Sequence, residues 1–226
     1  MTYAHNEENL YLAMYADTST SLKIAGTDLA INQTTDYPND GKIKISLNPK
    51  KPSSFKVHLR IPTWAGNQFV PGKLYKYLNQ KKESWGLTVN GSKTQAKVEK
   101  GFAIIERKWR KGDQIILDLP MPLRINQCDK RVEENHNRLA FTRGPFVLCA
   151  EEIDNGGATQ RFFLNQEKVE TKYNLTKVKL TSGSFSQVKT MANAVNESGG
   201  EEDKGLSLIP YYAWNNRKPG SMTIWF

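Results

Sequence analysis

Apolar and polar residues alternate with a period of two along most of the chain, and no window sustains the three- and four-residue apolar spacing of an amphipathic helix. Successive side chains of a β-strand point to opposite faces of a sheet, so this alternation is typical of strands with one buried face. The pattern predicts short strands at residues 9–15, 29–34, 41–47, 54–62, 85–91, 102–109, 113–120, 138–144, 145–152, 177–181 and 222–226.

Turn-forming residues separate these segments. Asn90-Gly91 lies between two alternating runs and predicts a type I′ hairpin, in which both central residues have positive φ. Lys111-Gly112-Asp113 predicts another tight reversal. Many short strands with frequent turns favour an all-β fold with two antiparallel, jelly-roll-like β-sandwich domains over a parallel α/β fold.

Shifts in composition divide the chain into two sets of strands. The first set is expected over residues 9–126, and residues 64–85, rich in Gly, Pro, Tyr and Lys, predict a long loop within it. The second unit is expected over residues 127–213 and opens with a polar connector at 127–137. Residues 182–204, which contain Ser, Asn, Gly and an acidic run, predict a loop in the second unit.

The chain ends in an apolar, aromatic segment, although most termini fray. Burying so much apolar surface favours a closing strand or hairpin in a sheet. The residues concerned are Tyr211, Tyr212, Trp214, Ile224, Trp225 and Phe226.

The formal net charge of +9 makes nucleic acid the first partner to consider. The basic residues are dispersed, however: Lys42 and Lys44 alternate with Ile43 and Ile45, so we expect them on a solvated strand face. The sequence has no cluster of five or six basic residues and no nucleic-acid motif. No nucleic-acid partner is predicted, and an acidic polysaccharide explains the positive charge somewhat better.

The sequence supports neither a membrane-spanning segment nor an N-terminal signal peptide. No run approaches the roughly 18 apolar residues of a membrane span, so no membrane partner is predicted. The first residues lack a basic region followed by an apolar stretch, so they do not form a signal peptide. Either the protein is cytoplasmic, or the sequence is an internal piece of a longer chain.

The candidate metal ligands and thiols are sparse. Cys128 and Cys149 are too few for a disulfide framework or a zinc knuckle, and inert buried thiols are favoured over a mutual disulfide or a reactive thiol. Glu133 and His136 have Glu-x-x-His spacing, but the polar flanks show no helical pattern to put both on one face. A solvated linker is the favoured interpretation, and no metal site is predicted.

Glu151 and Glu152 are a candidate carboxylate pair. Glycoside hydrolysis commonly uses two carboxyl groups about 5–10 Å apart that face one substrate. Adjacent residues on a strand point to opposite faces, so we expect surface groups or partners of nearby arginines instead. His58 is expected on the solvated face of its strand, without a partner. No catalytic residue is predicted in this chain.

Aromatic residues are better candidates for a ligand contact, because their flat faces can stack on sugar rings. Packing in the core or between domains is the favoured alternative, since Trp is usually mostly buried. Trp64 follows a strand end and is the tryptophan most open to exposure. The candidate interdomain or sugar contacts are Trp64, Arg143, Tyr212, Trp214 and Arg217.

Seven phrases, in order, resemble the C-terminal half of glycoside hydrolase family 127, the β-L-arabinofuranosidase family. Together they span nearly the whole chain, and the segment at 64–85 resembles the variant of gut Bacteroidetes members. The phrases are LYLAMY from Leu10, DYPNDGKIKISL from Asp36, LRIPTWA from Leu59, LTVNG from Leu87, ERKWRKGDQIILDLPMPLR from Glu106, RLAFTRGPFVLCAEE from Arg138 and LIPYYAWNNRKPGSMTIWF from Leu208.

The resemblance implies a helical catalytic (α/α)6 barrel followed by β-sandwich domains. It implies catalysis by a cysteine nucleophile beside a zinc ion, with all of these groups in the barrel. Cys128 and Cys149 match neither the nucleophile nor its spacing, so no cofactor is expected in this chain. The resemblance also implies that residues 214–226 return to the first sandwich, and that the parent protein is extracytoplasmic, in the periplasm.

The expected function is therefore that of a non-catalytic β-sandwich portion of a larger glycoside hydrolase, with the catalytic barrel of the same polypeptide as its partner. Because the resemblance begins mid-protein, the internal-piece interpretation of the first residues is favoured. The alternative is an independent carbohydrate-binding module for plant arabinose-containing or pectic glycans. A complete enzyme with novel chemistry is a third possibility, which lacks any visible arrangement of acid, base and nucleophile.

Overall fold

The computed structural model describes residues 2–66, 68–79, 84–165, 172–180 and 183–226. The chain divides into two units, residues 1–66 with 82–121 and residues 67–81 with 122–226. Antiparallel strands dominate both units, which confirms the predicted all-β class. Within the described residues the one α-helix is the single turn α1 (Glu152–Asn155), and no helix is long and apolar enough to cross a membrane.

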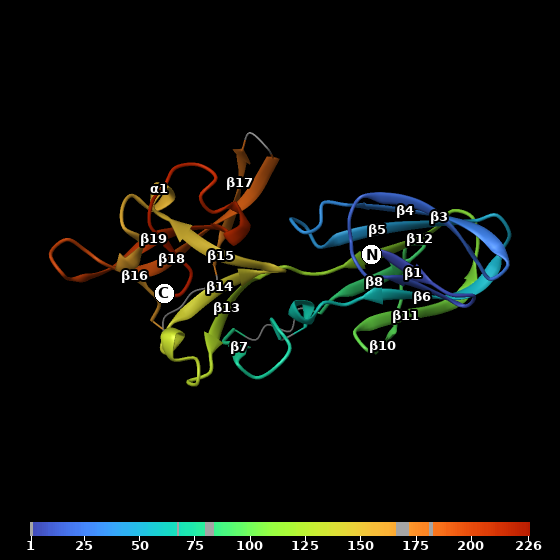
Figure 1. Ribbon diagram of the computed structural model, residues 1–226, viewed down its shortest axis with the longest axis horizontal. Helices are drawn as coiled ribbons and strands as arrows, with labels where there is room; N and C mark the ends of the chain where they lie inside the picture. The colour runs from blue at the N-terminus through green and yellow to red at the C-terminus, as the bar shows by residue number, and fades with distance from the viewer. Residues whose placement is uncertain (1, 67, 80–83, 166–171, 181–182) are drawn as a thin grey trace. The chain divides into compact units, whose positions relative to one another are not determined.

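The first unit consists of two sheets (Figure 1). One has the order β1-β2-β6-β11-β10 and the other the order β3-β4-β5-β12-β8-β9. Every pairing is antiparallel except β2 with β6, which is parallel. The strands are β1 (Tyr3–His5), β2 (Asn9–Leu12), β3 (Thr18–Ile24), β4 (Thr27–Thr35), β5 (Lys42–Pro49), β6 (Ser53–Arg60), β8 (Gly86–Val89), β9 (Ser92–Lys93), β10 (Lys97–Glu99), β11 (Phe102–Trp109) and β12 (Asp113–Asp118).

The core of the first unit follows the alternation in the sequence. Ile43 and Ile45 of β5 are fully buried, and they pair across the ladder with Leu117 and Ile115 of β12. Trp109 is also fully buried, and its Nε1 donates a hydrogen bond of 3.0 Å to the Phe55 carbonyl. An apolar residue at every second position therefore suffices to build this layer.

The turn at Asn90-Gly91 confirms the hairpin prediction. The φ angles are 51° and 78°, both in the left-handed region that a type I′ turn requires. The turn joins β8 to β9. The side chain of Asn90 also bonds β12, the other neighbour of β8 in the sheet: its Nδ2 donates to Asp113 Oδ1 at 2.8 Å, and its Oδ1 accepts from Gln114 N at 2.8 Å.

The second unit has one continuous strand path, β16-β18-β19-β15-β14-β13-β7, with β17 paired to β18 and β20 paired to β15. Its buried apolar residues form a core that includes Phe141, Leu148, Val188 and Leu208. The strands are β7 (Tyr75–Tyr77), β13 (Leu123–Cys128), β14 (Leu139–Arg143), β15 (Phe146–Glu151), β16 (Phe162–Phe163), β17 (Asn174–Leu180), β18 (Gly183–Val195), β19 (Glu201–Pro210) and β20 (Met222–Thr223).

The C-terminal strand corrects the predicted topology. Phe226 is buried as expected, but Ile224 and Trp225 are only half-buried and Tyr211, Tyr212 and Trp214 are exposed. The strand also joins the second unit instead of returning to the first. Strand β14 pairs with β15 only at their connected ends, so the two strands fork. Residues 222–226 fill this fork: β20 pairs with β15, and Phe226 exchanges two 2.9 Å backbone hydrogen bonds with Leu139 of β14.

The boundary between the units also differs from the prediction. The first unit ends at Met121 and not at residue 126, because β13 lies wholly in the second unit. Residues 67–81, expected as part of a loop over the first unit, belong to the second unit, where β7 adds an edge strand beside β13. The boundary therefore follows long-range strand pairing and not the polar connector.

The segment expected as a loop at residues 182–204 forms most of a long hairpin instead. Strands β18 and β19 pair from Val188–Leu208 to Val195–Glu201, and Val188, Ala192 and Ala194 are buried. Alternating apolar residues, even small ones, are enough for a strand when the core of the unit packs on them, as Phe141 and the other members of this cluster do here.

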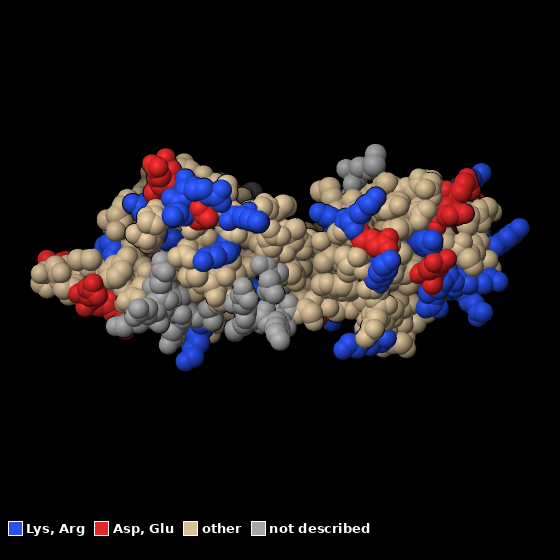
Figure 2. Space-filling view, turned by 90° about the horizontal axis from the view of Figure 1, so that it is seen from below, with Lys and Arg blue, Asp and Glu red and all other residues tan. Residues whose placement is uncertain are grey.

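Charged side chains are dispersed, as predicted. Figure 2 shows Lys and Arg spread over the face in view in both units, in places beside acidic side chains. Because no single basic patch dominates this face, the positive net charge gives no support to a nucleic-acid surface there.

His58 is buried, contrary to the expectation of a solvated position. Only 8% of its surface is exposed, because the Tyr11 ring stacks on it at 4.2 Å and Phe102 lies edge-on at 6.5 Å. Its Nε2 is 2.8 Å from Asn9 Oδ1. Burial lowers the pKa of His58 below its usual 6.5, and Lys56 lowers it further, against a smaller opposing effect of Glu99.

This burial predicts a loss of stability of the first unit at mildly acidic pH. Below the unfolded-state pKa of about 6.5, the unfolded chain takes up a proton that the native His58 resists, so the free energy of unfolding falls as pH falls. Urea unfolding at pH 7.5 and pH 5.5 should show this dependence weakened in His58→Gln. The matched control His5→Gln, at an exposed site, should leave it unchanged. Equal pH dependence in both variants would contradict the assignment.

Candidate functional site

The turn that follows β19 gathers three of the five predicted contact residues. It starts with the 3-10 turn η4 (Tyr211–Ala213) and continues through residues 214–217, so it carries Tyr212, Trp214 and Arg217. Asn215 has a φ of 61°, in the left-handed region that Asn adopts more readily than most residues. We call residues 211–217 the aromatic turn.

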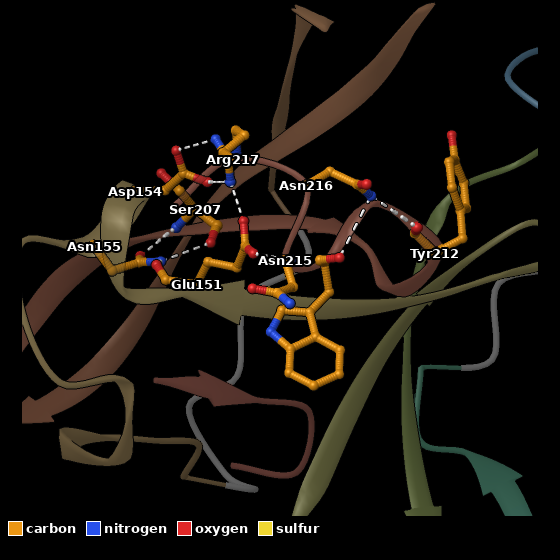
Figure 3. A network of polar contacts seen from close by, with 9 residues as sticks. Glu151, Asp154, Asn155, Ser207, Tyr212, Asn215, Asn216 and Arg217 are labelled. Atoms are coloured by element: carbon orange, nitrogen blue, oxygen red, sulfur yellow. Dashed lines mark hydrogen bonds and ion pairs between the residues drawn. The ribbon is translucent and has the colours of Figure 1, made fainter. Parts of the chain in front are cut away.

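A buried ion-pair cluster anchors this turn (Figure 3). Arg217 donates through Nη1 to Asp154 Oδ1 at 2.8 Å and through Nη2 to Asp154 Oδ2 at 2.5 Å. Nη2 also donates to Glu151 Oε2, and Glu151 Oε1 accepts from the Asn215 backbone at 2.8 Å. The side chains of Arg217 and Glu151 are only 16% and 5% exposed. Two-point hydrogen bonding to Asp154 therefore fixes the plane of the guanidinium.

Asn155 links the same cluster to β19. Its Nδ2 donates to the Glu151 carbonyl at 2.7 Å and to the Ser207 carbonyl at 3.0 Å, and its Oδ1 accepts from Ser207 N at 2.9 Å. Helix α1, β15 and β19 are thus connected through one amide group, as Figure 3 shows.

The electrostatics of the cluster indicate a structural role. The hydrogen bond to Asp154 raises the pKa of Arg217 above its usual range, assisted by Glu151 and opposed by burial. Both oxygens of Glu151 are engaged, one by Arg217 and the other by the backbone of the turn. This confirms the expectation that Glu151 is the partner of an arginine. Glu152 points elsewhere: it accepts from Ser221 N and Oγ at 2.9 Å, and these bonds lower its pKa.

The anchored turn displays its aromatic side chains. Tyr211, Tyr212 and Trp214 are 45%, 57% and 39% exposed. The rings of Tyr211 and Trp214 are nearly parallel, with centroids 5.9 Å apart, and Tyr212 packs against Phe146 at 5.4 Å. Exposed aromatic residues on a turn that hydrogen bonds hold in place are typical of contact surfaces.

The other two predicted contact residues lie elsewhere. Trp64 is in the 3-10 turn η1 (Thr63–Ala65) of the first unit and is only 9% exposed. Its ring stacks on Tyr37 with centroids 6.5 Å apart, so the packing interpretation holds for Trp64 and the exposed one is wrong. Arg143 is the half-buried last residue of β14, opposite Phe146.

The two cysteines are buried and, within the part of the chain that the structure describes, are not gathered with other potential metal ligands. Among the described residues no group of three His, Cys, Asp or Glu could hold a metal ion. Cys128 is a buried free thiol that donates to the Asn135 carbonyl at 3.0 Å. Cys149 is also free and buried, and burial raises its pKa to about 12, with Glu151 adding to the effect. A thiol with so high a pKa is a poor ligand and nucleophile.

Comparison with known families assigns the chain. Residues 9–121 match the β-L-arabinofuranosidase GH127 middle domain, and residues 123–226 match the glycoside hydrolase family 127 C-terminal domain. The chain belongs to glycoside hydrolase family 127. The junction of these two family 127 domains coincides with the boundary between the structural units at Met121.

Individual relatives agree with the assignment. A non-reducing end β-L-arabinofuranosidase from Bifidobacterium longum is 26% identical over 215 residues, which are 87% of this chain and 30% of that protein. A solved GH127 β-arabinofuranosidase superposes with a TM-score of 0.90 at 33% identity, covering 100% of this chain and 36% of the other. A GH127 β-L-arabinofuranosidase from Geobacillus stearothermophilus T6 gives 0.85 at 28% identity, covering 99% and 34%. The chain spans about a third of the length of these relatives.

Sequence reasoning missed how the anchoring cluster is assembled. Glu151 and Arg217 are 66 positions apart, and Asn155 reaches Ser207 across 52. The sequence offered only two separate hints, the acidic residues within 151–154 and the single arginine, Arg217, in the aromatic segment. These hints are too weak to predict a contact between the two segments.

Proposed function

We propose that this family 127 chain is a non-catalytic accessory portion that packs against, supports and solubilises the catalytic domain of a β-L-arabinofuranosidase-like glycoside hydrolase. The observation that carries the proposal is the match of the whole chain to a middle and a C-terminal domain, over about a third of the relatives' length. The reaction of the parent, its extracytoplasmic location and a zinc ion in its catalytic domain are parts of the same proposal.

The described side chains support this role. The carboxylates of Glu151 and Asp154 are held by Arg217 at the base of the aromatic turn, which makes them anchors of that turn. The aromatic turn itself offers the kind of rigid, partly apolar surface that a neighbouring domain covers. The proposal assigns that turn to the contact with the catalytic domain.

A chimera tests the proposal. In the Bifidobacterium longum relative, the 215 matched residues would be replaced by this chain, and soluble yield and hydrolysis of a β-L-arabinofuranoside would be measured. We expect deletion of the matched region to abolish soluble expression, and this chain to restore it in part. The purified 226-residue chain should show no turnover. Zinc-independent turnover by this chain, or full activity of the deletion variant, would refute the accessory role.

A further inference from the structure

The second unit contains a small pocket with an excess of positive charge. It lies where the end of β13 meets β7, and residues next to η2 (Glu133–Asn135) complete it. Its volume is about 260 Å³, close to the lower end of small-molecule sites, so it suits one ring and not a longer chain. None of the described residues that line it belongs to the aromatic turn.

Hydrogen bonds hold the walls of this pocket together. The Asp129 backbone N donates to the Leu74 carbonyl at 2.7 Å, which ties β13 to the residues before β7. Cys128 Sγ donates to the Asn135 carbonyl at 3.0 Å, and Val132 N donates to the Asp129 carbonyl at 2.9 Å. The segments that form the pocket are therefore fixed relative to one another, so a ligand has little backbone to order when it binds.

The charges that line the pocket are not balanced. Lys73, Lys76 and Lys130 all line it and are exposed, so a ligand can reach them. Asp129 is the one acid among the described lining residues, and its Oδ1 already accepts from Arg131 Nε at 2.8 Å and from Arg131 N at 3.1 Å. No described carboxylate forms an ion pair with any of these lysines. A concave site with such an excess of one charge concentrates ions of the opposite sign.

Other surface lysines differ from these three. Several have a carboxylate partner, and one that stands alone on a solvated strand face, such as Lys44, needs none. Three ammonium groups that line one small pocket repel one another, and a bound anion relieves the repulsion. The paired lysines are Lys50 with Asp28, Lys56 with Glu106, Lys97 with Glu99 and Lys204 with Glu202.

The remaining lining residues favour an acidic sugar over a simple anion. His136 and Asn137 line the pocket with groups that both donate and accept hydrogen bonds, which suits hydroxyl groups. Leu74 is 44% exposed and offers an apolar surface to the C–H face of a ring. Inorganic phosphate would pair with the lysines and leave these other groups unused.

We propose that this pocket binds one uronate ring, a sugar that carries a carboxylate. The carboxylate lies among the ammonium groups of Lys73, Lys76 and Lys130, the hydroxyl groups bond to His136 and Asn137, and the ring packs on Leu74. The site gives the second unit a ligand of its own, which goes beyond support of a catalytic domain and does not depend on it.

The test is a titration of the 15N-labelled chain with methyl α-D-galacturonoside. Methyl α-D-galactoside is the matched control ligand, because it has the same ring without the carboxylate. We expect saturable shifts of the backbone amides at 127–130 and 136–137 with the uronate, and affinity for the neutral galactoside lower by about tenfold or more. Raising the ionic strength from about 0.02 M to about 0.3 M should weaken uronate binding severalfold, because salt screens exposed charges.

Lysine variants locate the site. Lys76→Gln and Lys130→Gln should each weaken uronate binding roughly 3- to 10-fold, the range for one lost charge contact in solvent. Both side chains are exposed, so the variants should keep the amide spectrum of the folded protein. The matched control Lys189→Gln removes an exposed lysine of β18 that does not line the pocket, and it should leave the affinity within about twofold.

Four results would overturn the proposal. One is the absence of saturable shifts with the uronate. Another is equal affinity for the uronate and the neutral galactoside, which would leave the lysines without a role. A third is an equal loss of affinity in Lys189→Gln and Lys76→Gln. The fourth is tighter binding of inorganic phosphate than of the uronate at the same amides, which would make the pocket an anion site that does not recognise a sugar.

Discussion

Replacing Arg217 with methionine is expected to destabilise the second unit by about 3–5 kcal/mol, the cost of breaking a buried ion pair from one side. The substitution leaves Glu151 and Asp154 facing each other, 5% and 15% exposed, without their shared cation. It also releases the aromatic turn, because Glu151 holds the Asn215 backbone in the geometry that Arg217 stabilises. Hydrogen exchange of the β15 amides, compared with those of β5 in the first unit, would localise the effect.

Two controls separate this result from a general effect of losing a charge. Arg131→Met removes an ion pair with Asp129 in which the arginine side chain is 64% exposed, and it should lower the free energy of unfolding far less than Arg217→Met does, because solvent screens an exposed pair. The triple variant Glu151→Gln, Asp154→Asn, Arg217→Met should be more stable than Arg217→Met alone, since no unpaired buried charge remains. A triple variant less stable than the single variant would show that the cluster acts through packing and not through charge.

Phe226→Ala is expected to destabilise the second unit by about 3–5 kcal/mol, as for other buried Phe-to-Ala changes. The Phe226 side chain is only 6% exposed, and its ring centroid lies 6.1 Å from that of Phe141 in the core. The backbone bonds to Leu139 hold the terminus in place, so little collapse into the cavity is expected. Guanidinium unfolding would measure the loss of stability, and native-state hydrogen exchange of the β13–β15 amides would show that it lies in the second unit.

This variant also discriminates between two topologies. If the terminal strand completed the first unit, as the resemblance implied, Phe226→Ala would accelerate exchange in β5 and β12 instead. Leu175→Ala, at a position 45% exposed on β17, is the matched control and should change the free energy of unfolding by less than about 0.5 kcal/mol. Faster exchange confined to the first unit would contradict the fork assignment.

Local patterns predicted much of the fold. Alternation alone identified the strands around Ile43, Ile45 and Trp109. In a strand with one face buried and the other exposed to solvent, every second residue must be apolar. Asn90-Gly91 specified its hairpin, since positive φ at both positions restricts the residues that fit. Both signals lie within a few residues, so no knowledge of distant partners was needed.

The candidate site was less accessible to such reasoning. The sequence singled out Tyr212, Trp214 and Arg217, and the structure gathers them on one turn. The sequence could not predict which residues anchor this turn, because Glu151 and Asp154 lie more than 60 positions from Arg217 along the chain. Trp64 and His58 were misjudged for a related reason: each is covered by a ring from another strand or loop, Tyr37 and Tyr11.

The sequence by itself determined the secondary-structure class, several turns and a strand within residues 222–226 that ends in the buried Phe226, since these depend on local spacing and on the apolar surface of the residues concerned. Only the tertiary structure decided that residues 222–226 fill the fork between β14 and β15, and that Glu151, Asp154 and Arg217 meet to anchor the aromatic turn. The alternation of apolar and polar residues has the same period of two in every strand, so it cannot specify which strands pair. The strand partners and the geometry of the site depend instead on contacts between segments far apart in the sequence.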